Sequence, residues 1–276
     1  MEPRTLLFTD LDGTFLEHRT FSFETARSVL PTLRAIGIPV IFSTSKTRAE
    51  VEPLQRELGL CAPFIAENGA AVFIPHGTFP FDPPNAERRG AYDVIPFGAS
   101  YASVVKHLDE VERETGVALL SFHLMTTDQI AAETGLSLTA AAHAKMREFD
   151  VPFRLADPDP EAEIKVRAAI HAKGLSLTCG ARYFHLHLGC DKGGSARALT
   201  DLYRKAWGEV RTVAIGDSEN DLSLLENVLV AAIVRREDGA HDPVLIERLP
   251  QAIRAEGIGP AGFAEIVKRL IAGSMR

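Results

Sequence analysis

Four short segments carry side chains whose types and spacing suit phosphate chemistry. They are Asp10-Leu11-Asp12-Gly13-Thr14, Ser43-Thr44-Ser45-Lys46, Asp191-Lys192-Gly193-Gly194 and Gly216-Asp217-Ser218-Glu219-Asn220-Asp221. A carboxylate can attack phosphorus, and a neighbouring carboxylate can move a proton. Hydroxyls at a helix start hold phosphate, lysine offsets its charge, and carboxylates are ligands that Mg²⁺ accepts. The four segments together therefore predict one phosphate-handling site.

Each segment also has a simpler interpretation. Asp and Gly are ordinary turn residues, so the two acidic segments can be turns that cap the next element. Thr44 and Ser45 can cap a helix, and Lys192 can be a solvated lysine. The occurrence of all four segments in this order favours the shared site over four unrelated features.

The elements around these segments predict an α/β fold. Residues 5–9, 39–43, 211–216 and 229–234 form apolar runs that indicate buried strands, and 64–66 and 71–74 are shorter runs of the same kind. Helices are expected at 23–36 (Ser22 as N-cap, Gly37 after its end), from the Thr47/Glu50 capping box onward, at 192–207 and from about 261. Alternating strands and helices, with strands apolar on both faces, indicate a parallel sheet covered by helices. The carboxyl ends of such strands meet at one edge, where ligands bind.

The middle of the chain has a different pattern. The Pro-rich segment 79–85 is a candidate linker, followed by expected helices at 100–115, 127–134, 137–146 and 161–173 and strands at 175–179 and 182–188. In the last strand Phe184, Leu186 and Leu188 alternate with Tyr183, His185 and His187, which predicts an antiparallel sheet with one open face. We therefore expect a core of residues 1–84 and 190–276 with an inserted α+β unit at 85–189.

Composition narrows the class of protein. The net charge of −7 predicts no broad basic surface for nucleic acid. No apolar run reaches the roughly 18 residues of a membrane span, and Met1-Glu2-Pro3-Arg4 does not start a signal peptide. Three cysteines at unrelated spacings argue against a disulfide framework, so a cytoplasmic protein is expected.

Taken in order, the four segments resemble the phosphatases of the haloacid dehalogenase superfamily, and the insert resembles the C2 cap of its sugar phosphatases. The resemblance implies a Rossmann-like parallel-sheet core with helices on both faces and an inserted α+β cap. It also implies that Asp10 is the nucleophile, forming an aspartyl-phosphate, and that Asp12 protonates the leaving oxygen and then activates water. Thr44 and Lys192 would bind phosphate. Mg²⁺ would sit on Asp10, the backbone carbonyl of Asp12 and Asp217, with Asn220 in support and Asp221 as ligand or support.

One departure concerns the second segment, where many members of the subgroup read Thr-Gly-Arg and this chain reads Thr44-Ser45-Lys46. Ungapped matching gives Thr44 as the phosphate hydroxyl, and Ser43 is its rival.

A narrower resemblance involves the insert. Residues 43–47, 134–136, 147–153 and 180–185 are similar to those of mannosyl-3-phosphoglycerate phosphatases, which implies a phosphorylated sugar-glycerate substrate and mannosylglycerate, a compatible solute, as product. Arg147 and Arg182 are candidate partners of the glycerate carboxylate, with surface salt bridges as the alternative. Glu67, Asn68, Glu148 and His185 are candidates for hydroxyl contacts. Ser43, Ser45, Lys46 and Gly69 complete the expected substrate-binding set.

Other interpretations remain at this level. His185 and His187 share a strand face, so a metal pair is conceivable, although an open-face or substrate-contact role is favoured. Glucosyl-3-phosphoglycerate and sucrose phosphate are alternative substrates. A non-enzymatic sugar-phosphate sensor is the alternative of another class, but binding alone needs neither Asp10 nor Asp12.

Overall fold

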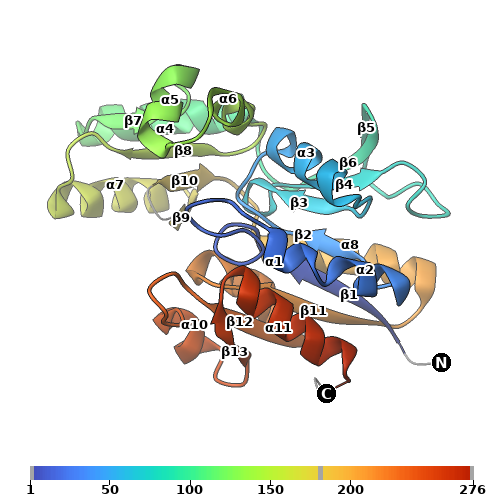
Figure 1. Cartoon of the computed structure of the whole chain (residues 1–276). Coiled ribbons are helices and arrows are strands. Elements are labelled where there is room, and N and C mark those ends of the chain that lie inside the picture. The colour runs from blue at the N-terminus through green and yellow to red at the C-terminus, as the bar shows by residue number, and fades with distance from the viewer. Residues whose placement is uncertain (1–2, 180–182, 274–276) are drawn as a thin grey trace.

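The largest sheet of the protein is parallel and contains five strands. The computed structural model describes residues 3–179 and 183–273, and the strand order of this sheet is β13-β12-β11-β1-β2 (Figure 1). The strands are β1 (Arg4–Thr9), β2 (Val40–Phe42), β11 (Val210–Gly216), β12 (Val230–Arg235) and β13 (Ile253–Ile258). All four neighbouring pairs are parallel, which confirms the predicted sheet. The β12–β13 pair has a register shift.

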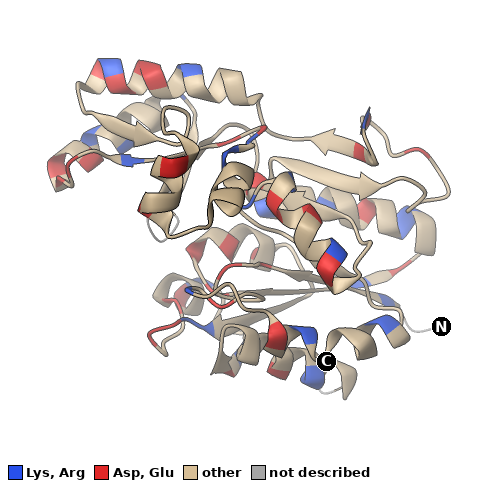
Figure 2. Ribbon diagram, turned by 45° about the horizontal axis from the view of Figure 1, so that its top comes forward, with Lys and Arg blue, Asp and Glu red and all other residues tan. Residues whose placement is uncertain are grey.

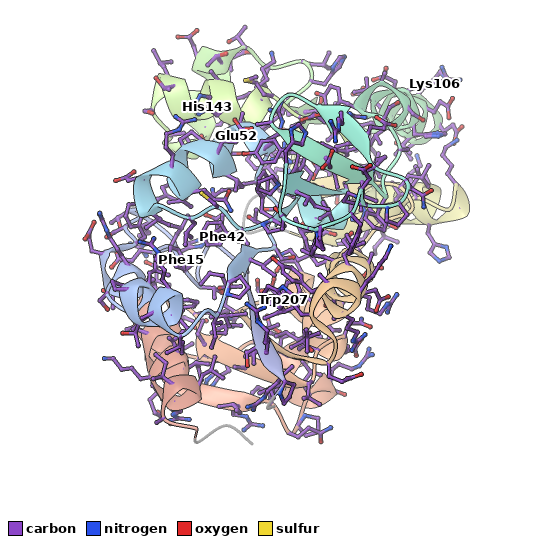
Figure 3. The ribbon with its side chains drawn as sticks, turned by 90° about the vertical axis from the view of Figure 1, so that its right-hand side faces the viewer. Phe15, Phe42, Glu52, Lys106, His143 and Trp207 are labelled. Atoms are coloured by element: carbon purple, nitrogen blue, oxygen red, sulfur yellow. The ribbon has the colours of Figure 1, made fainter. Side chains whose placement is uncertain are left out.

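Helices cover both faces of this sheet. One face packs against α1 (Glu24–Arg27), α2 (Leu30–Ala35) and α11 (Pro260–Ile271), and the other against α8 (Lys192–Trp207), α9 (Leu222–Glu226) and α10 (Pro243–Arg248). Each face of the sheet has its own hydrophobic core, and alternate residues of β1 point into different cores. Leu7 lies in the first core, with α1, α2 and α11, and Leu6 and Phe8 lie in the second, with α8, α9 and α10. Phe15 and Phe42 meet edge to face in the first core, with ring centroids 5.2 Å apart (Figure 3). The α/β class is therefore confirmed.

The single helix expected at 23–36 is wrong in detail. The structure has two short helices, α1 and α2, and the N-cap position of α1 is Phe23 rather than Ser22. Pro31 lies in the first turn of α2, where a residue without a backbone N–H is tolerated. In the middle of one continuous helix the same proline would remove a backbone hydrogen bond and interrupt the helix.

A second sheet is antiparallel, which corrects the placement of residues 64–74 in the parallel sheet. Its order is β3-β4-β6-β5, built from β3 (Phe64–Ala66), β4 (Ala71–Pro75), β5 (Glu87–Arg89) and β6 (Tyr92–Pro96). β3 and β4 are joined by the short turn η1 (Glu67–Gly69) and Ala70, and a parallel crossover needs a dozen or more residues. The helix before them, α3 (Arg48–Leu58), has the predicted Thr47/Glu50 capping box. β6 pairs with β4, and β5 pairs with β6, although both strands come after residue 84 in the sequence. The domain boundaries at residues 84 and 189 stay a prediction.

The third sheet is also antiparallel and lies in the insert. Its order is β7-β8-β10-β9, with β7 (Leu119–Ser121), β8 (Val151–Leu155), β9 (Ser176–Cys179) and β10 (Phe184–His187). The helices of this part are α4 (Tyr101–Thr115), α5 (Thr127–Thr134), α6 (Leu138–Lys145) and α7 (Pro160–Ala172). The expected open face is wrong, because Tyr183, His185 and His187 are all buried. Tyr183 packs in a cluster with residues of α5 and α6, and His185 faces the segment before β8.

The insert rests on α3 of the core. The hydroxyl of Thr47, just before α3, donates to the carbonyl of His143 in α6, 2.9 Å away, and α3 and α6 pack against each other. Arg48 of α3 donates to Glu148 at 3.0 Å. Lys and Arg are interspersed with Asp and Glu along the helices in Figure 2. In the described part of the chain, no helix combines the length and apolar character needed to cross a membrane.

Candidate active site

The four predicted segments meet at the carboxyl edge of the parallel sheet. Asp10 follows β1 and donates its backbone N–H to Ile215 of β11, while Ser43 follows β2 and donates to Thr9 of β1. Lys192 opens α8, and Asp217 follows β11, before the short turn η2 (Glu219–Asp221). Parallel register therefore brings together residues that are far apart in the sequence, as predicted.

Lys192 joins two of the carboxylates. Its ammonium nitrogen lies 2.7 Å from Oδ1 of Asp10 and 2.6 Å from Oδ1 of Asp221. Its side chain is only 1% exposed, so the long aliphatic stem passes through the protein interior. Burial lowers the pKa of Lys192, but Asp10 and Asp221 raise it by more, so the residue stays charged.

Asp217 completes an acidic cluster that lies within reach of a single ion. Asp10, Asp217 and Asp221 each offer a carboxylate oxygen, and these atoms lie within 4.8 Å of one another. The hydroxyl of Thr14 donates to Oδ1 of Asp217 at 2.9 Å. Both oxygens of Asp221 already accept hydrogen bonds, from Lys192 and from the backbone of Asp217. Asp221 is therefore better placed to support the site than to ligate an ion.

The electrostatics of this cluster suit a divalent cation. Burial, followed by repulsion from Asp221, raises the pKa of Asp10 to about 7 despite the lowering effect of Lys192. Burial, then Asp221 and Asp10, also raise the pKa of Asp217 well above its usual value. One lysine thus faces three buried carboxylates, and added positive charge would relieve their repulsion. Oxygen donors of this kind fit Mg²⁺.

Two glycines allow the acidic loops to approach closely. A Cβ on Gly13, whose φ is +82°, would lie 2.7 Å from Oδ2 of Asp217, and a Cβ on Gly216 would lie 2.5 Å from Oδ2 of Asp221. Side chains at these positions would push the carboxylates apart. The glycines of the D-x-D-G and G-D-S motifs are therefore needed for packing as well as for turning.

Asp12 lies at the more open side of the cluster. Its side chain is 30% exposed and Oδ1 lies 3.0 Å from the ammonium nitrogen of Lys46. Lys46 also lies 3.7 Å from Oε1 of Glu50. Burial lowers the pKa of Lys46, but Asp12 and Glu50 raise it by more, so a cation faces Asp12.

Ser43 and Thr44 are both fully buried, and the structure leaves both as candidate phosphate hydroxyls. Thr44 Oγ1 accepts the backbone N–H of Lys46 at 3.1 Å, and its own proton is not donated to any residue in the described part of the chain. Ser43 Oγ has no hydrogen-bond partner within residues 3–179 and 183–273. Ser45 presents its carbonyl oxygen to Arg147.

Glu67, Asn68 and Gly69 form a strained turn beside these loops. Their φ angles are +48°, +58° and +94°, which is uncommon for the two residues that carry a Cβ. A Cβ on Gly69 would lie 2.2 Å from the backbone of Asp191, so the turn packs directly against the start of α8. Ser195 of α8 donates to the carbonyl of Gly69 at 2.5 Å. Asn68 Oδ1 is buried and has no hydrogen-bond partner in the described chain, so it remains free to accept a hydrogen bond.

Glu67 fastens this turn to the insert. Its carboxylate accepts the backbone N–H groups of Glu148, Phe149 and Asp150 at distances of 2.9 to 3.2 Å. Asp150 in turn accepts from Asn68 Nδ2 at 3.3 Å. The candidate hydroxyl-binding residues therefore lie where the core turn meets the insert.

Arg147 and His185 are both paired with Asp150. Arg147 donates to Asp150 and, at 3.0 Å, to the carbonyl of Ser45, and its side chain is 5% exposed. His185 Nδ1 lies 2.8 Å from Asp150 Oδ2. Burial raises the pKa of Asp150, but Arg147 and His185 lower it by more, so the pKa lies below its usual value. Arg147 thus forms a buried ion pair rather than a surface salt bridge, and its role toward a substrate carboxylate stays a prediction.

Two other expected residues, Glu148 and Asn220, contact neighbouring side chains. Glu148 pairs with Arg48 and with Arg89, and Asn220 Oδ1 accepts from the hydroxyl of Ser218 at 2.8 Å. Arg182 falls outside the described residues. His187 has different neighbours from His185, which contacts Asp150. The ring nitrogens of His187 lie 2.7 Å from Thr178 Oγ1 and 3.4 Å from Cys190 Sγ.

Sequence reasoning missed Asp150 and the role of Thr14. Asp150 lies between Phe149 and Val151, and no spacing in the sequence connects it with Glu67, Asn68 or His185. Thr14 belongs to the D-x-D-G-T motif, and its bond to Asp217 could have been predicted from the meeting of the first and fourth segments.

Comparison with known proteins places the chain among hydrolases. Residues 7–79 match the family model described as haloacid dehalogenase-like hydrolase. The chain is 43% identical over 266 residues to a glucosyl-3-phosphoglycerate/mannosyl-3-phosphoglycerate phosphatase of Methanococcoides burtonii, covering 96% of this chain and 97% of the relative. It is 34% identical over 229 residues to a mannosyl-3-phosphoglycerate phosphatase of Pyrococcus furiosus, covering 83% and 90%.

Solved structures share the whole fold. A phosphatase of the haloalkanoate enzyme superfamily from Bacteroides thetaiotaomicron superposes with a TM-score of 0.68 at 19% identity, covering 99% of this chain and 96% of the other. The sucrose-phosphatase of Synechocystis superposes with a TM-score of 0.61 at 15% identity, covering 98% of each chain.

Proposed function

Because the chain belongs to the haloacid dehalogenase-like hydrolases, and within them to the phosphatases, we propose that it hydrolyses mannosyl-3-phosphoglycerate to mannosylglycerate and phosphate. The observation that carries the chemical part is the buried contact of Asp10 with Lys192 beside Asp217 and Asp221. The names of relatives that match over nearly the whole chain support the choice of substrate. In this role the enzyme would complete the synthesis of a compatible solute.

The proposed reaction uses two carboxylates in turn. Asp10 attacks phosphorus, an oxygen–phosphorus bond forms, and the ester oxygen of the glycerate leaves with a proton from Asp12. Asp12 then takes a proton from water, which attacks the aspartyl-phosphate and releases phosphate and free Asp10. Lys192 holds Asp10 in place and offsets its repulsion from the anionic ester. A hydroxyl of Thr44 or Ser43 would bind the phosphate oxygens.

Mg²⁺ fits the acidic cluster, with Asp10, Asp217 and the backbone carbonyl of Asp12 as its proposed ligands. Asp221 and Asn220 would support these ligands. When bound, the ion would neutralise charge on the transferring phosphoryl group.

The substrate's glycerate and sugar are proposed to lie between the core loops and the insert. Asn68 and His185 are the best placed hydroxyl partners, since both lie at the Glu67–Asp150 junction. Ser45, Lys46, Gly69 and Glu148 remain proposed substrate contacts near this junction. Arg147 would act through its pair with Asp150, which holds the segment after α6 against Ser45. Arg182 remains a candidate for the carboxylate.

Glucosyl-3-phosphoglycerate is a second candidate substrate. Two relatives, at 43% and 35% identity, carry a name that includes both the glucosyl and the mannosyl compound. The two sugars differ in one hydroxyl configuration, and such a difference changes specificity strongly only if the site binds that hydroxyl directly.

Phosphate release over a panel of esters tests the proposal. The panel holds mannosyl-3-phosphoglycerate, glucosyl-3-phosphoglycerate, sucrose phosphate, other sugar phosphates and p-nitrophenyl phosphate, each with Mg²⁺. We expect the highest kcat/KM for a glycosyl-3-phosphoglycerate. A higher kcat/KM for sucrose phosphate would assign that compound as the substrate instead. Binding of these esters without turnover would favour a non-enzymatic sugar-phosphate sensor.

A further inference from the structure

The loop after the first motif contains a strained aromatic residue, Phe21. Its φ is +55°, and it is the only apolar residue in the described ranges 3–179 and 183–273 with a positive φ. For a bulky side chain this conformation is an outlier that costs about 1–3 kcal/mol and persists only where the surroundings impose it. The loop is closed by backbone bonds from Phe21 to Glu17 and from Glu17 to Ser22.

Burial of the ring does not account for this strain. Phe21 remains 36% exposed, whereas its neighbour Phe23 packs against the first core. None of the four hydrophobic clusters of the described residues includes Phe21. The strained backbone of Phe21 is therefore not explained by burial of its ring, and another contact of the side chain is needed to account for it.

The ring instead faces a cation of the candidate active site. The ammonium nitrogen of Lys46 lies 4.9 Å from the centroid of the Phe21 ring, within the range of a cation–π contact. The same nitrogen lies 3.0 Å from Asp12 Oδ1, and in the part of the chain that the structure describes Lys46 is the one cation that pairs with Asp12. Glu50 also pairs with Lys46, and Oε2 of Glu50 is itself held by the backbone N–H of Thr47, which donates to it.

We propose that Phe21 is a positioning residue for the leaving-group side of the reaction: its ring holds Lys46, and Lys46 holds the carboxylate of Asp12. Asp12 is the most exposed of the four acids of the site, and among the described residues its side chain pairs only with Lys46. This inference rests on the proposed function in one respect, that Asp12 gives its proton to the departing oxygen.

The leaving group supplies a readout that a purely structural role would not move. An alkyl oxygen of glycerate needs a proton as its bond to phosphorus breaks, whereas p-nitrophenolate is a stable anion and needs little help. Misplacement of Asp12 should therefore lower kcat/KM more for the alkyl ester than for the nitrophenyl ester. The comparison uses kcat/KM because this ratio reports the steps up to departure of the leaving group, whereas the later attack of water, which Asp12 also assists, is common to both esters.

The experiment compares Phe21→Leu with Phe21→Tyr, which keeps the aromatic face. We expect Phe21→Leu to lower kcat/KM for a glycosyl-3-phosphoglycerate by about two- to thirtyfold, which corresponds to the energy of one cation–π contact, with a smaller loss on p-nitrophenyl phosphate. Phe21→Tyr should recover most of the rate. Phe81→Leu is the matched control, because it removes a contact of the same kind with Lys205, whose nitrogen lies 4.0 Å from the Phe81 ring. This control should keep the wild-type rates on both esters.

A double-mutant cycle tests the route through Lys46. In a Lys46→Met background, Phe21→Leu should lower the rate by less than about a further twofold. The effects of the two substitutions should not add, because Phe21 is proposed to act only through its contact with Lys46. Equal losses on both esters, no loss on either, or full additivity with Lys46→Met would overturn the proposal. If the wild type hydrolysed neither glycosyl-3-phosphoglycerate, the proposed function would fail, while another alkyl phosphate compared with p-nitrophenyl phosphate would still decide the role of Phe21.

Discussion

Lys192 Nζ lies 2.7 Å from Asp10 Oδ1, although 182 positions separate the two residues in the sequence. The contact places a cation beside the proposed nucleophile in a site where both side chains are almost fully buried. We expect Lys192→Met to lower kcat/KM for any phosphate ester by at least about a hundredfold, since one preorganised charge contact is typically worth that much. Lys205→Met changes an exposed lysine of the same helix and should have no effect on steady-state rates.

Removal of divalent metal should stop turnover. With EDTA we expect loss of phosphate release, restored by excess Mg²⁺ and poorly by Ca²⁺, whose larger and looser shell disturbs the geometry. Asp217→Ala should remain impaired at every Mg²⁺ concentration. Glu219→Ala removes an exposed acid of the same turn and should behave as wild type. Full activity in chelator would refute the metal role.

Gly69 should tolerate no side chain. Gly69→Ala forces a Cβ to within 2.2 Å of the Asp191 backbone, so either the turn or the start of α8 with Lys192 must shift. Gly77→Ala is a control with the same kind of backbone strain, because Gly77 has φ +80° and no atom lies within 4 Å of the position that a Cβ would take there. We expect Gly69→Ala to lose at least about 2 kcal/mol more stability than Gly77→Ala in urea unfolding, together with most activity. Similar losses in the two variants would contradict the packing argument.

Asp150 should stabilise the fold more than an equivalent surface acid. Asp150→Asn leaves Arg147 buried without its ionic partner, which costs about 3–5 kcal/mol. Asp201→Asn breaks a pair of the same i,i+3 spacing with Arg204, but Asp201 is 68% exposed, so the loss should stay below about 1 kcal/mol. Denaturant unfolding of the two variants measures the difference.

Asp150 should also make the free energy of unfolding depend on pH in the acid range. The pKa of Asp150 is lower in the folded than in the unfolded protein, because Arg147 and His185 outweigh burial. Its contribution is therefore complete above the unfolded pKa of about 3.9 and is lost as the pH falls from there toward the folded pKa. Asp150→Asn should flatten the pH dependence of unfolding in this acid range. An unchanged slope would show that the Arg147 pair does not couple to proton binding.

The sequence was sufficient to predict the parallel sheet and the meeting of Asp10, Lys192 and Asp217, because apolar strands and the residues after them obey simple geometric rules. It did not predict the antiparallel pairing of β3 and β4, since short apolar runs look alike in either kind of sheet. The buried roles of Arg147 and His185 depend on Asp150, whose burial and pairing with His185, 35 positions later, have no signal in the sequence. The left-handed conformation of Phe21 also has no signature in the residue type, because aromatic residues rarely adopt it.

The central claim is that a glycosyl-3-phosphoglycerate transfers its phosphoryl group to Asp10. Mannosyl-3-phosphoglycerate labelled in its phosphate should be mixed with excess enzyme and Mg²⁺, quenched with acid within the first turnover and digested for mass spectrometry. We expect the label on the peptide that contains Asp10, and no label and less than about a hundredth of the wild-type turnover with Asp10→Asn. Label on another residue, or rapid phosphate release by Asp10→Asn, would contradict the account.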